Sequence, residues 1–411
     1  MKINQWTLGL AAAGVVSLAS AVQAEEAAAN QVMTAVSATT LSGYVDTSIQ
    51  WRPGTGNATG AGAFSGASKQ DGFNLNVVKL RLEKVLDESE WAAGYRAELL
   101  FGPDAVGYNT SANATGGGAL AQDFSIKDAY VQLRAPVGNG LDFKLGSFST
   151  IGGYEVFESG DNANYSRSYA WQAEPTQHTG LLMSYKVADA LTIKAGVANT
   201  FSAGINARTA KSATGNESRK TYIGGLFLTA PESMGALKGA TLTGTITKGF
   251  ANGGGLLGAT SDTTAYFFGV TTPTGLAGLT AGLSYDYIGS QANKLTGGKS
   301  GYFNALGAYM SYQATEKLKF NGRGEYASST AGVISGFTGG PIGANVVGGK
   351  EKVMAATLDV DYNLWANVVS RLEVRWDHDL SKRNDGALFD TAAGNGAKNQ
   401  YLVALNVIYK F

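Results

Sequence analysis

Histidine and cysteine, which often carry out catalysis or bind transition metals, are nearly absent from this sequence. The chain has no cysteine, which excludes thiol chemistry and disulfides, and its only histidines are His178 and His378. The sequence places no nucleophile beside His178, so this residue is a poor candidate for a catalytic base. Asp377 and Asp379 flank His378, but alternation along a strand would point them to the opposite face. We therefore expect no enzyme activity, no cofactor and no metal site.

The charged side chains with the best functional prospects lie in an aromatic-rich segment, Ile151 to Gln177. It joins two alternating stretches, Leu141–Gly146 and Thr179–Lys186, and it is too long for a hairpin turn. Connections of this length are usually functional. The rings of this segment need burial, which argues against a solvated surface loop. The candidate residues of the segment are Tyr154, Glu155, Glu158, Asp161, Tyr165, Arg167, Tyr169, Trp171 and Glu174.

The overall composition favours many strands connected by loops. Glycine is frequent, at 56 residues, whereas proline, which cannot donate a hydrogen bond to a sheet, occurs only 7 times. The glycines have no three-residue period, which excludes a collagen helix. Because 32 basic residues balance 32 acidic ones, a nucleic-acid partner is not expected.

About sixteen stretches have the length that a tilted strand needs to cross a bilayer. Short turns alternate with long glycine-rich loops between them, as in bacterial outer-membrane barrels, and a barrel of this size leaves a water-filled channel. We therefore predict an all-β fold: a transmembrane antiparallel β-barrel into which the segment Ile151 to Gln177 folds as a constriction loop. The predicted strands are Leu41–Trp51, Phe73–Leu86, Glu90–Phe101, Phe124–Arg134, Leu141–Phe148, His178–Lys186, Leu191–Thr200, Lys220–Thr229, Ala240–Phe250, Thr263–Thr271, Leu279–Gly289, Gly301–Gln313, Lys317–Ala327, Val353–Tyr362, Val368–His378 and Gln400–Phe411.

Several of these strands carry charged residues on one face and apolar residues on the other. A soluble barrel would have the apolar face inside, whereas a membrane barrel with a wet lumen has it outside. The faces of Lys220–Thr229 and Thr263–Thr271 cannot be assigned, because these stretches alternate poorly. The predicted lumen wall contains Lys79, Arg81, Arg96, Glu98, Arg323, Glu325, Arg371, Glu373 and Arg375.

The acidic loop and this basic wall would set up a transverse electric field if they face each other across a narrow lumen. Glu325 and Glu373 on the same wall would weaken that field. We therefore expect weak ion selectivity that depends on Arg323, Arg371 and Arg375.

The N-terminal residues have the pattern of an export signal. Lys2 precedes an apolar, alanine-rich run, Leu8 to Ala21, and Ala24 supplies the small residue that a signal peptidase requires. We predict a signal peptide at 1–24, a periplasmic lead at 25–38 and an outer-membrane barrel domain at 39–411. No later window of about eighteen residues is uncharged and apolar, so we expect no helical span. An even strand count would place both termini in the periplasm.

Two parts of the chain resemble known proteins. The last stretch alternates apolar residues up to the aromatic Phe411, and it resembles the signal that the outer-membrane barrel assembly machinery reads. The central segment resembles the OmpL-like β-barrel porins of Gram-negative bacteria. This resemblance covers mainly residues 40–200, and it implies a passive pore for no particular solute and a loop-anchoring role for His178. The matching elements are Gly43-Tyr44-Val45-Asp46, Lys127-Asp128-Ala129-Tyr130-Val131, Gly153-Tyr154-Glu155-Val156, Tyr165-Ser166-Arg167-Ser168-Tyr169, Pro175 and His178-Thr179-Gly180.

We therefore expect an outer-membrane porin for the passive diffusion of small hydrophilic solutes and ions. A substrate-specific channel, for example for sugars, is one alternative. A plugged structural barrel is another, and an outer-membrane hydrolase is a third that the scarcity of histidine disfavours. The expected partners are outer-membrane lipid and lipopolysaccharide, the barrel assembly machinery and small hydrophilic solutes, and a homotrimer is left open.

Overall fold

The computed structural model describes residues 39–54, 69, 71–107, 124–201, 204–208, 218–251, 261–291, 300–338, 349–382, 388–390 and 396–411. The predicted signal peptide and periplasmic lead lie outside these residues. Within the described ranges, no helix has the length and apolar character that a membrane span requires.

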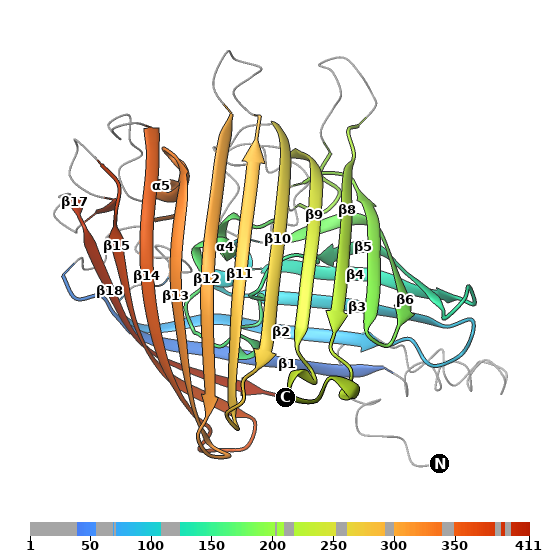
Figure 1. Cartoon of the computed structure of the whole chain (residues 1–411), viewed down its shortest axis with the longest axis horizontal. Coiled ribbons are helices and arrows are strands. Elements are labelled where there is room, and N and C mark those ends of the chain that lie inside the picture. Colours follow the sequence, from blue (N-terminus) through green and yellow to red (C-terminus); the bar gives the residue numbers. More distant parts are fainter. Residues whose placement is uncertain are drawn as a thin grey trace, which may run out of the picture.

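Sixteen antiparallel strands form a closed barrel (Figure 1). The first and last strands, β1 and β18, pair with each other, with Tyr44 opposite Lys410 and Trp51 opposite Val403. The predicted sixteen-strand barrel is therefore confirmed, and its closure leaves no sheet edge open to another chain. The barrel strands are β1 (Thr40–Trp51), β2 (Gly72–Lys84), β3 (Ala93–Phe101), β4 (Phe124–Ala135), β5 (Leu141–Ser149), β6 (Gln177–Ala188), β7 (Leu191–Ala198), β8 (Thr221–Thr229), β9 (Thr241–Ala251), β10 (Ser261–Pro273), β11 (Leu279–Ser290), β12 (Gly301–Gln313), β13 (Leu318–Thr330), β14 (Lys350–Tyr362), β15 (Val368–Asp379) and β18 (Asn399–Lys410).

The connections between strands differ at the two ends of the barrel. Short turns join β10 to β11, β12 to β13 and β14 to β15 at the lower end in Figure 1, where the C-terminus also lies. We call this the turn end. The tight turns need unusual backbone conformations, which Gly138 (φ +59°) supplies between β4 and β5 and Asn367 (φ +62°) between β14 and β15. The other elements are η1 (Pro103–Gly107), η2 (Ser159–Asp161), α4 (Tyr169–Ala173), η3 (Glu232–Leu237), α5 (Val333–Thr338) and a small pair, β16 (Phe389–Asp390) with β17 (Gly396–Ala397).

The barrel has apolar side chains outside and charged side chains inside. On β15, Leu372 and Val374 are 49% and 47% exposed, whereas Arg371, Glu373 and Arg375 are at most 2% exposed. This polarity is the reverse of that of a soluble barrel, and it suits a surface that contacts lipid and an interior that holds polar groups.

The two strands with unassigned faces also have exposed side chains outside, but several of their inward positions are apolar as well. On β10, Tyr266 and Phe268 are exposed on the outside, and Phe267 between them is buried inside. On β8, Tyr222 is exposed and Ile223 is buried. Because several inward positions of both strands hold glycine or apolar residues such as Ile223 and Phe267, the polar and apolar faces do not differ clearly in the sequence.

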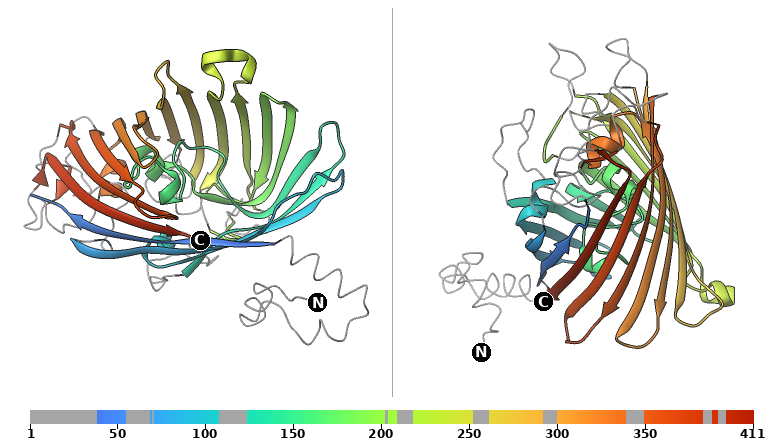
Figure 2. Two further views of the ribbon diagram at one scale, coloured as in Figure 1. Left: turned by 90° about the horizontal axis from the view of Figure 1, so that it is seen from below. Right: turned by 90° about the vertical axis from the view of Figure 1, so that its left-hand side faces the viewer.

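Residues 150–176, which connect β5 to β6, lie inside the ring of strands (Figure 2, left). We call them the inner segment; they contain η2 and α4. Helix α4 begins after Ser168, whose Oγ accepts a hydrogen bond from the backbone N–H of Trp171 at 3.1 Å. Gly153 has φ +120°, a conformation that strongly favours glycine.

Candidate functional site

Arg323 on β13 fixes the inner segment to the barrel wall. Its guanidinium donates to Glu155 Oε1 and to the carbonyl oxygen of Ser166, both at 2.7 Å. Its Nε donates to Glu325 Oε2 at 2.8 Å. The three charged side chains are almost completely buried. A buried cation requires such partners, so the loop and the wall satisfy each other here.

Two arginines of β15 bind carbonyl oxygens of the inner segment. Arg371 Nη2 donates to the carbonyl oxygen of Ser159, and Arg375 Nη1 donates to that of Arg167, both at 2.6 Å. The planar guanidinium offers several donors in a fixed geometry, which suits contacts with an irregular backbone.

Wall carboxylates bind the backbone amides of the same segment. Glu373 accepts a hydrogen bond from the N–H of Tyr165 at 2.7 Å, and Glu325 accepts one from the N–H of Tyr169 at 2.8 Å. The Tyr169 hydroxyl donates to Asp377 Oδ1 at 2.9 Å. Because the chain in this segment has little regular structure, these side chains supply backbone partners that a helix or sheet would otherwise provide.

A second group of charges anchors the segment to β2, β3 and β4. Lys79 pairs with Glu158 and, at 2.9 Å, with Glu98, and Lys127 lies 3.3 Å from Glu158. Burial opposes the ionisation of Glu158, but Lys127 and Lys79 outweigh it and hold the pKa of Glu158 well below its usual range. Glu158 therefore stays ionised as a fixed anchor.

The predicted opposition of an acidic loop and a basic wall across an open lumen is wrong. The inner segment lies against that wall, and Arg323, Arg371 and Arg375 are at most 2% exposed. Opposite charges in contact attract each other far more strongly than charges separated by water, and a buried arginine without a partner would be very costly. These arginines anchor the segment, and they do not line an open space.

Other predicted residues also lie in or beside this network. Arg167 is buried, lies over the Trp171 ring at 5.6 Å and donates to the carbonyl oxygen of Phe157 at 2.7 Å. Asp161 is half-exposed and pairs with Lys410 at 2.7 Å.

Arg81, Arg96 and Glu98 of the predicted wall lie close together, and Glu174 of the predicted loop lies near β11. Arg81 and Arg96 are partly exposed on the inner face, beside the buried Glu98. Glu174 is partly buried at the end of α4 near Asp286 of β11, and desolvation followed by the charge of Asp286 raises the pKa of Glu174 well above its usual range.

The residues at the strand ends have simpler surroundings. His178, at the start of β6, is buried against Phe148, with the two ring centroids 6.3 Å apart. Phe411 is exposed beyond the end of β18, and its backbone pairs with Gly43. No group of three or more His, Cys, Asp or Glu side chains that could hold a metal ion occurs in the described ranges.

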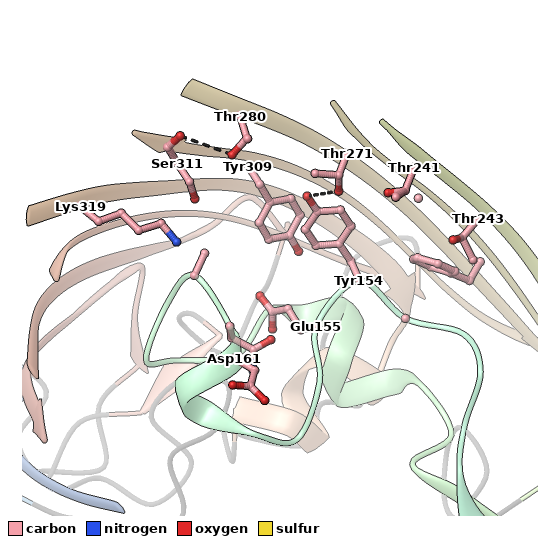
Figure 3. Close-up of a pocket in the computed structure, with 15 residues that line it drawn as sticks. Tyr154, Glu155, Asp161, Thr241, Thr243, Thr271, Thr280, Tyr309, Ser311 and Lys319 are labelled. Carbon is pink, nitrogen blue, oxygen red and sulfur yellow. Dashed lines mark hydrogen bonds between the residues drawn. The ribbon is translucent and has the colours of Figure 1, made fainter. Parts of the chain in front are cut away.

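A cavity of about 340 Å³ lies on the other side of the inner segment, against β9 to β13. Figure 3 shows its wall of hydroxyl groups, with Tyr154, Glu155 and Asp161 of the inner segment facing it. The Tyr154 and Tyr309 rings are stacked with centroids 4.0 Å apart, and the Tyr154 hydroxyl lies 2.9 Å from Thr271 Oγ1. We call this space the threonine-lined cavity; its wall side chains include Thr241, Thr243, Phe267, Thr271, Thr280, Tyr309, Ser311 and Lys319.

Apart from Tyr154, Glu155 and Asp161, the side chains of this cavity were not among the candidates from sequence. One signal was available: β9 has threonine at positions 241, 243, 245 and 247, alternating with other residues. A row of hydroxyls on one face of a strand indicates a wet surface, although none of these side chains carries a charge.

Comparisons with known proteins agree with this architecture. The family model described as beta-barrel porin-2, OmpL-like, matches residues 38–411. No curated protein matches the chain significantly.

Several solved porin structures are similar in fold. An anion-selective porin from Comamonas acidovorans has a TM-score of 0.57 at 13% identity, over 91% of this chain and 99% of that one. OmpT, an outer membrane protein of Vibrio cholerae solved in its trimer form, has a TM-score of 0.54 at 13% identity, over 91% of this chain and 99% of that one. The outer membrane channel DcaP of Acinetobacter baumannii has a TM-score of 0.53 at 12% identity, over 91% of this chain and 97% of that one. Identities this low show a shared fold alone.

The family match covers the whole barrel, and the chain therefore belongs to the OmpL-like family of β-barrel porins, which are channel proteins of the outer membrane.

Proposed function

We propose that this porin allows the passive diffusion of small hydrophilic solutes and ions through the threonine-lined cavity. One observation carries the proposal: the inner segment is fixed to the charged wall of β13 to β15 and of β2 to β4, and the cavity of about 340 Å³ lies on its other side, against the hydroxyl-rich wall. The inner segment then narrows the barrel from one side and leaves the passage on the other.

The chemistry of the cavity suits solutes that must exchange their hydration shell quickly. Threonine and serine hydroxyls donate and accept hydrogen bonds without holding a full charge, so they can replace water around many different solutes.

Conductance of the refolded protein in a planar bilayer tests this proposal. We expect discrete, ohmic current steps in potassium chloride, and proteoliposomes should swell faster in arabinose than in raffinose because of size. A protein that refolds to β-structure but gives no steps and no swelling would overturn the proposal.

A channel selective for neutral sugars is the second candidate, because Tyr154, Phe267 and Tyr309 are interleaved with hydroxyls in the cavity. Aromatic faces and hydroxyls together suit the apolar and polar faces of a sugar ring. A general pore should pass potassium chloride almost unaffected by added sugar. A selective channel should show saturable block by one sugar at millimolar concentration.

We also propose that the turn end faces the periplasm and that the long connections face outward, as in bacterial outer-membrane barrels generally. The Vibrio cholerae neighbour was solved in its trimer form, which supports a homotrimer here. Lipid and lipopolysaccharide would surround the apolar outer face, and the barrel assembly machinery would read the end of β18 at Phe411. This function requires no catalytic group and no cofactor.

A further inference from the structure

Two lysines project into the barrel near the turn end. Lys144 is the fourth residue of β5 and Lys194 is the fourth residue of β7, and both strands begin at short turns. Their neighbours Leu145 and Ile193 are exposed on the outer face, at 59% and 40%, so alternation points the lysines inward. The inner segment leaves β5 at the other end of that strand, so the lysines lie on its turn-end side.

Neither lysine has an acidic partner among the described residues. The acidic side chains on this part of the wall already have partners: Asp128 lies 3.9 Å from Lys127, Asp142 lies 2.7 Å from Arg134, and Glu83 lies 2.8 Å from Arg96. In contrast with the arginines that hold the inner segment, Lys144 and Lys194 therefore leave two positive charges uncompensated on this wall. A narrow site between low-dielectric walls strengthens the effect of such charges.

Aromatic rings hold both ammonium groups without neutralising them. Lys144 Nζ lies 4.7 Å from the Tyr130 ring centroid, and Arg96 approaches the same ring at 5.8 Å. Lys194 Nζ lies 4.4 Å from the Phe227 ring centroid. These cation–π contacts favour defined side-chain positions and leave the N–H donors of the lysines free for a solute. Each lysine thus lies next to a ring on a neighbouring strand, Tyr130 of β4 for Lys144 and Phe227 of β8 for Lys194.

The spacing of the two lysines suits one ligand with two negative groups. In the register, Lys144 lies opposite Leu182 of β6 and Lys194 lies opposite Ser184, so the lysines are two strands apart and two residues out of step. This places their Cα atoms roughly 12 Å apart. Their flexible side chains can converge on a short dicarboxylate, and the Ser184 hydroxyl between them can donate a further hydrogen bond.

We propose that Lys144 and Lys194 form a binding site for small dicarboxylates at the turn end of the lumen. The site deepens the proposed function by naming a class of solute that is held during passage, and this role rests on the proposed diffusion path. Binding itself requires only the folded barrel and can be measured without any current.

The test measures the binding of sodium succinate to the refolded full-length barrel in deuterated detergent, by saturation-transfer difference NMR at low ionic strength. We expect saturation transfer to succinate that falls on addition of 0.5 M sodium chloride. The double variant K144Q/K194Q should bind succinate about tenfold more weakly, the loss expected for two solvated ion pairs. The variant K144R/K194R keeps both charges and should retain most of the binding.

The matched control is Lys186→Gln, which removes the same charge near the end of β6, where Lys186 is exposed and pairs with Asp189. It should bind succinate as the wild type does. Equal succinate binding by the wild type and K144Q/K194Q would overturn the site, whether or not the protein conducts. A folded protein that binds succinate but gives no current would refute the diffusion path and leave the site standing.

Discussion

Replacing Arg323 with methionine should release the inner segment and leave the barrel folded. The Arg323 guanidinium donates five hydrogen bonds, to Glu155, Glu325, Thr357 and both oxygens of Ser166. In Arg323→Met, both carboxylates would be left buried without this cation. Breaking a buried ion pair by removing one partner costs about 3–5 kcal/mol.

The protein can avoid most of this cost by moving the inner segment into water. The backbone hydrogen bonds of the barrel lie in its strand ladders, so the barrel does not depend on the segment to satisfy them. A loss of about 3 kcal/mol shifts a docking equilibrium by roughly a hundredfold. We therefore expect larger and noisier single-channel currents from Arg323→Met, and a thermal unfolding temperature that changes little.

The matched control is Arg134→Met, because Arg134 also pairs with a carboxylate, that of Asp142, but both side chains are about one third exposed. Such pairs contribute about 0–1 kcal/mol, so its currents should match those of the wild type. If Arg323→Met and Arg134→Met gave the same conductance, the conclusion that Arg323 anchors the segment would be refuted.

Three further predictions concern the cavity, the pH response and the orientation. A Cβ at Gly282 would collide with the Tyr154 hydroxyl, so Gly282→Ala should displace Tyr154 and alter the conductance. Gly324 has open space around it, so Gly324→Ala should leave the conductance unchanged. Equal currents from the two variants would contradict this prediction. The pKa of Glu174 is raised above the ordinary 4.5 when the inner segment is docked, so docking favours the protonated acid. Docking should therefore weaken as the pH rises from about 4.5 towards the raised pKa. The current noise should grow with pH in the wild type but not in Glu174→Gln. An epitope between β13 and β14 should be accessible on intact cells, and one in the turn between β12 and β13 only after the outer membrane is broken; the reverse result would invert the proposed orientation.

The strands could be predicted well because a membrane barrel repeats one simple pattern. The sixteen predicted strands agree with the observed ones to within a few residues, and in most of them a period of two with polar residues inside gave the face, as in the run from Arg371 to Arg375. The faces of β8 and β10 could not be predicted, because inward glycines such as Gly225 and Gly269 show neither polarity nor size.

The position of the inner segment was harder to predict than its existence. Its length and its rings indicated that it would fold inward. The contacts that decide which wall it lies against, such as Arg323 with Glu155, join residues far apart in sequence and depend on strand register. The sequence therefore indicated the wrong residues as the lining of the open space. The charged wall residues pair with the inner segment, and uncharged threonines of β9 line the cavity.

The central claim is that the inner segment narrows the barrel from within. Deleting residues 160–170 removes η2 from its second residue and the start of α4, together with the backbone contacts of Tyr165 and Arg167, but it removes no strand. The most direct measurement compares the single-channel conductance and the largest permeant sugar of the wild type and this deletion. We expect the deletion variant to form a folded barrel with a higher conductance and a larger size limit for permeant sugars. An unchanged conductance together with an unchanged size limit would contradict it.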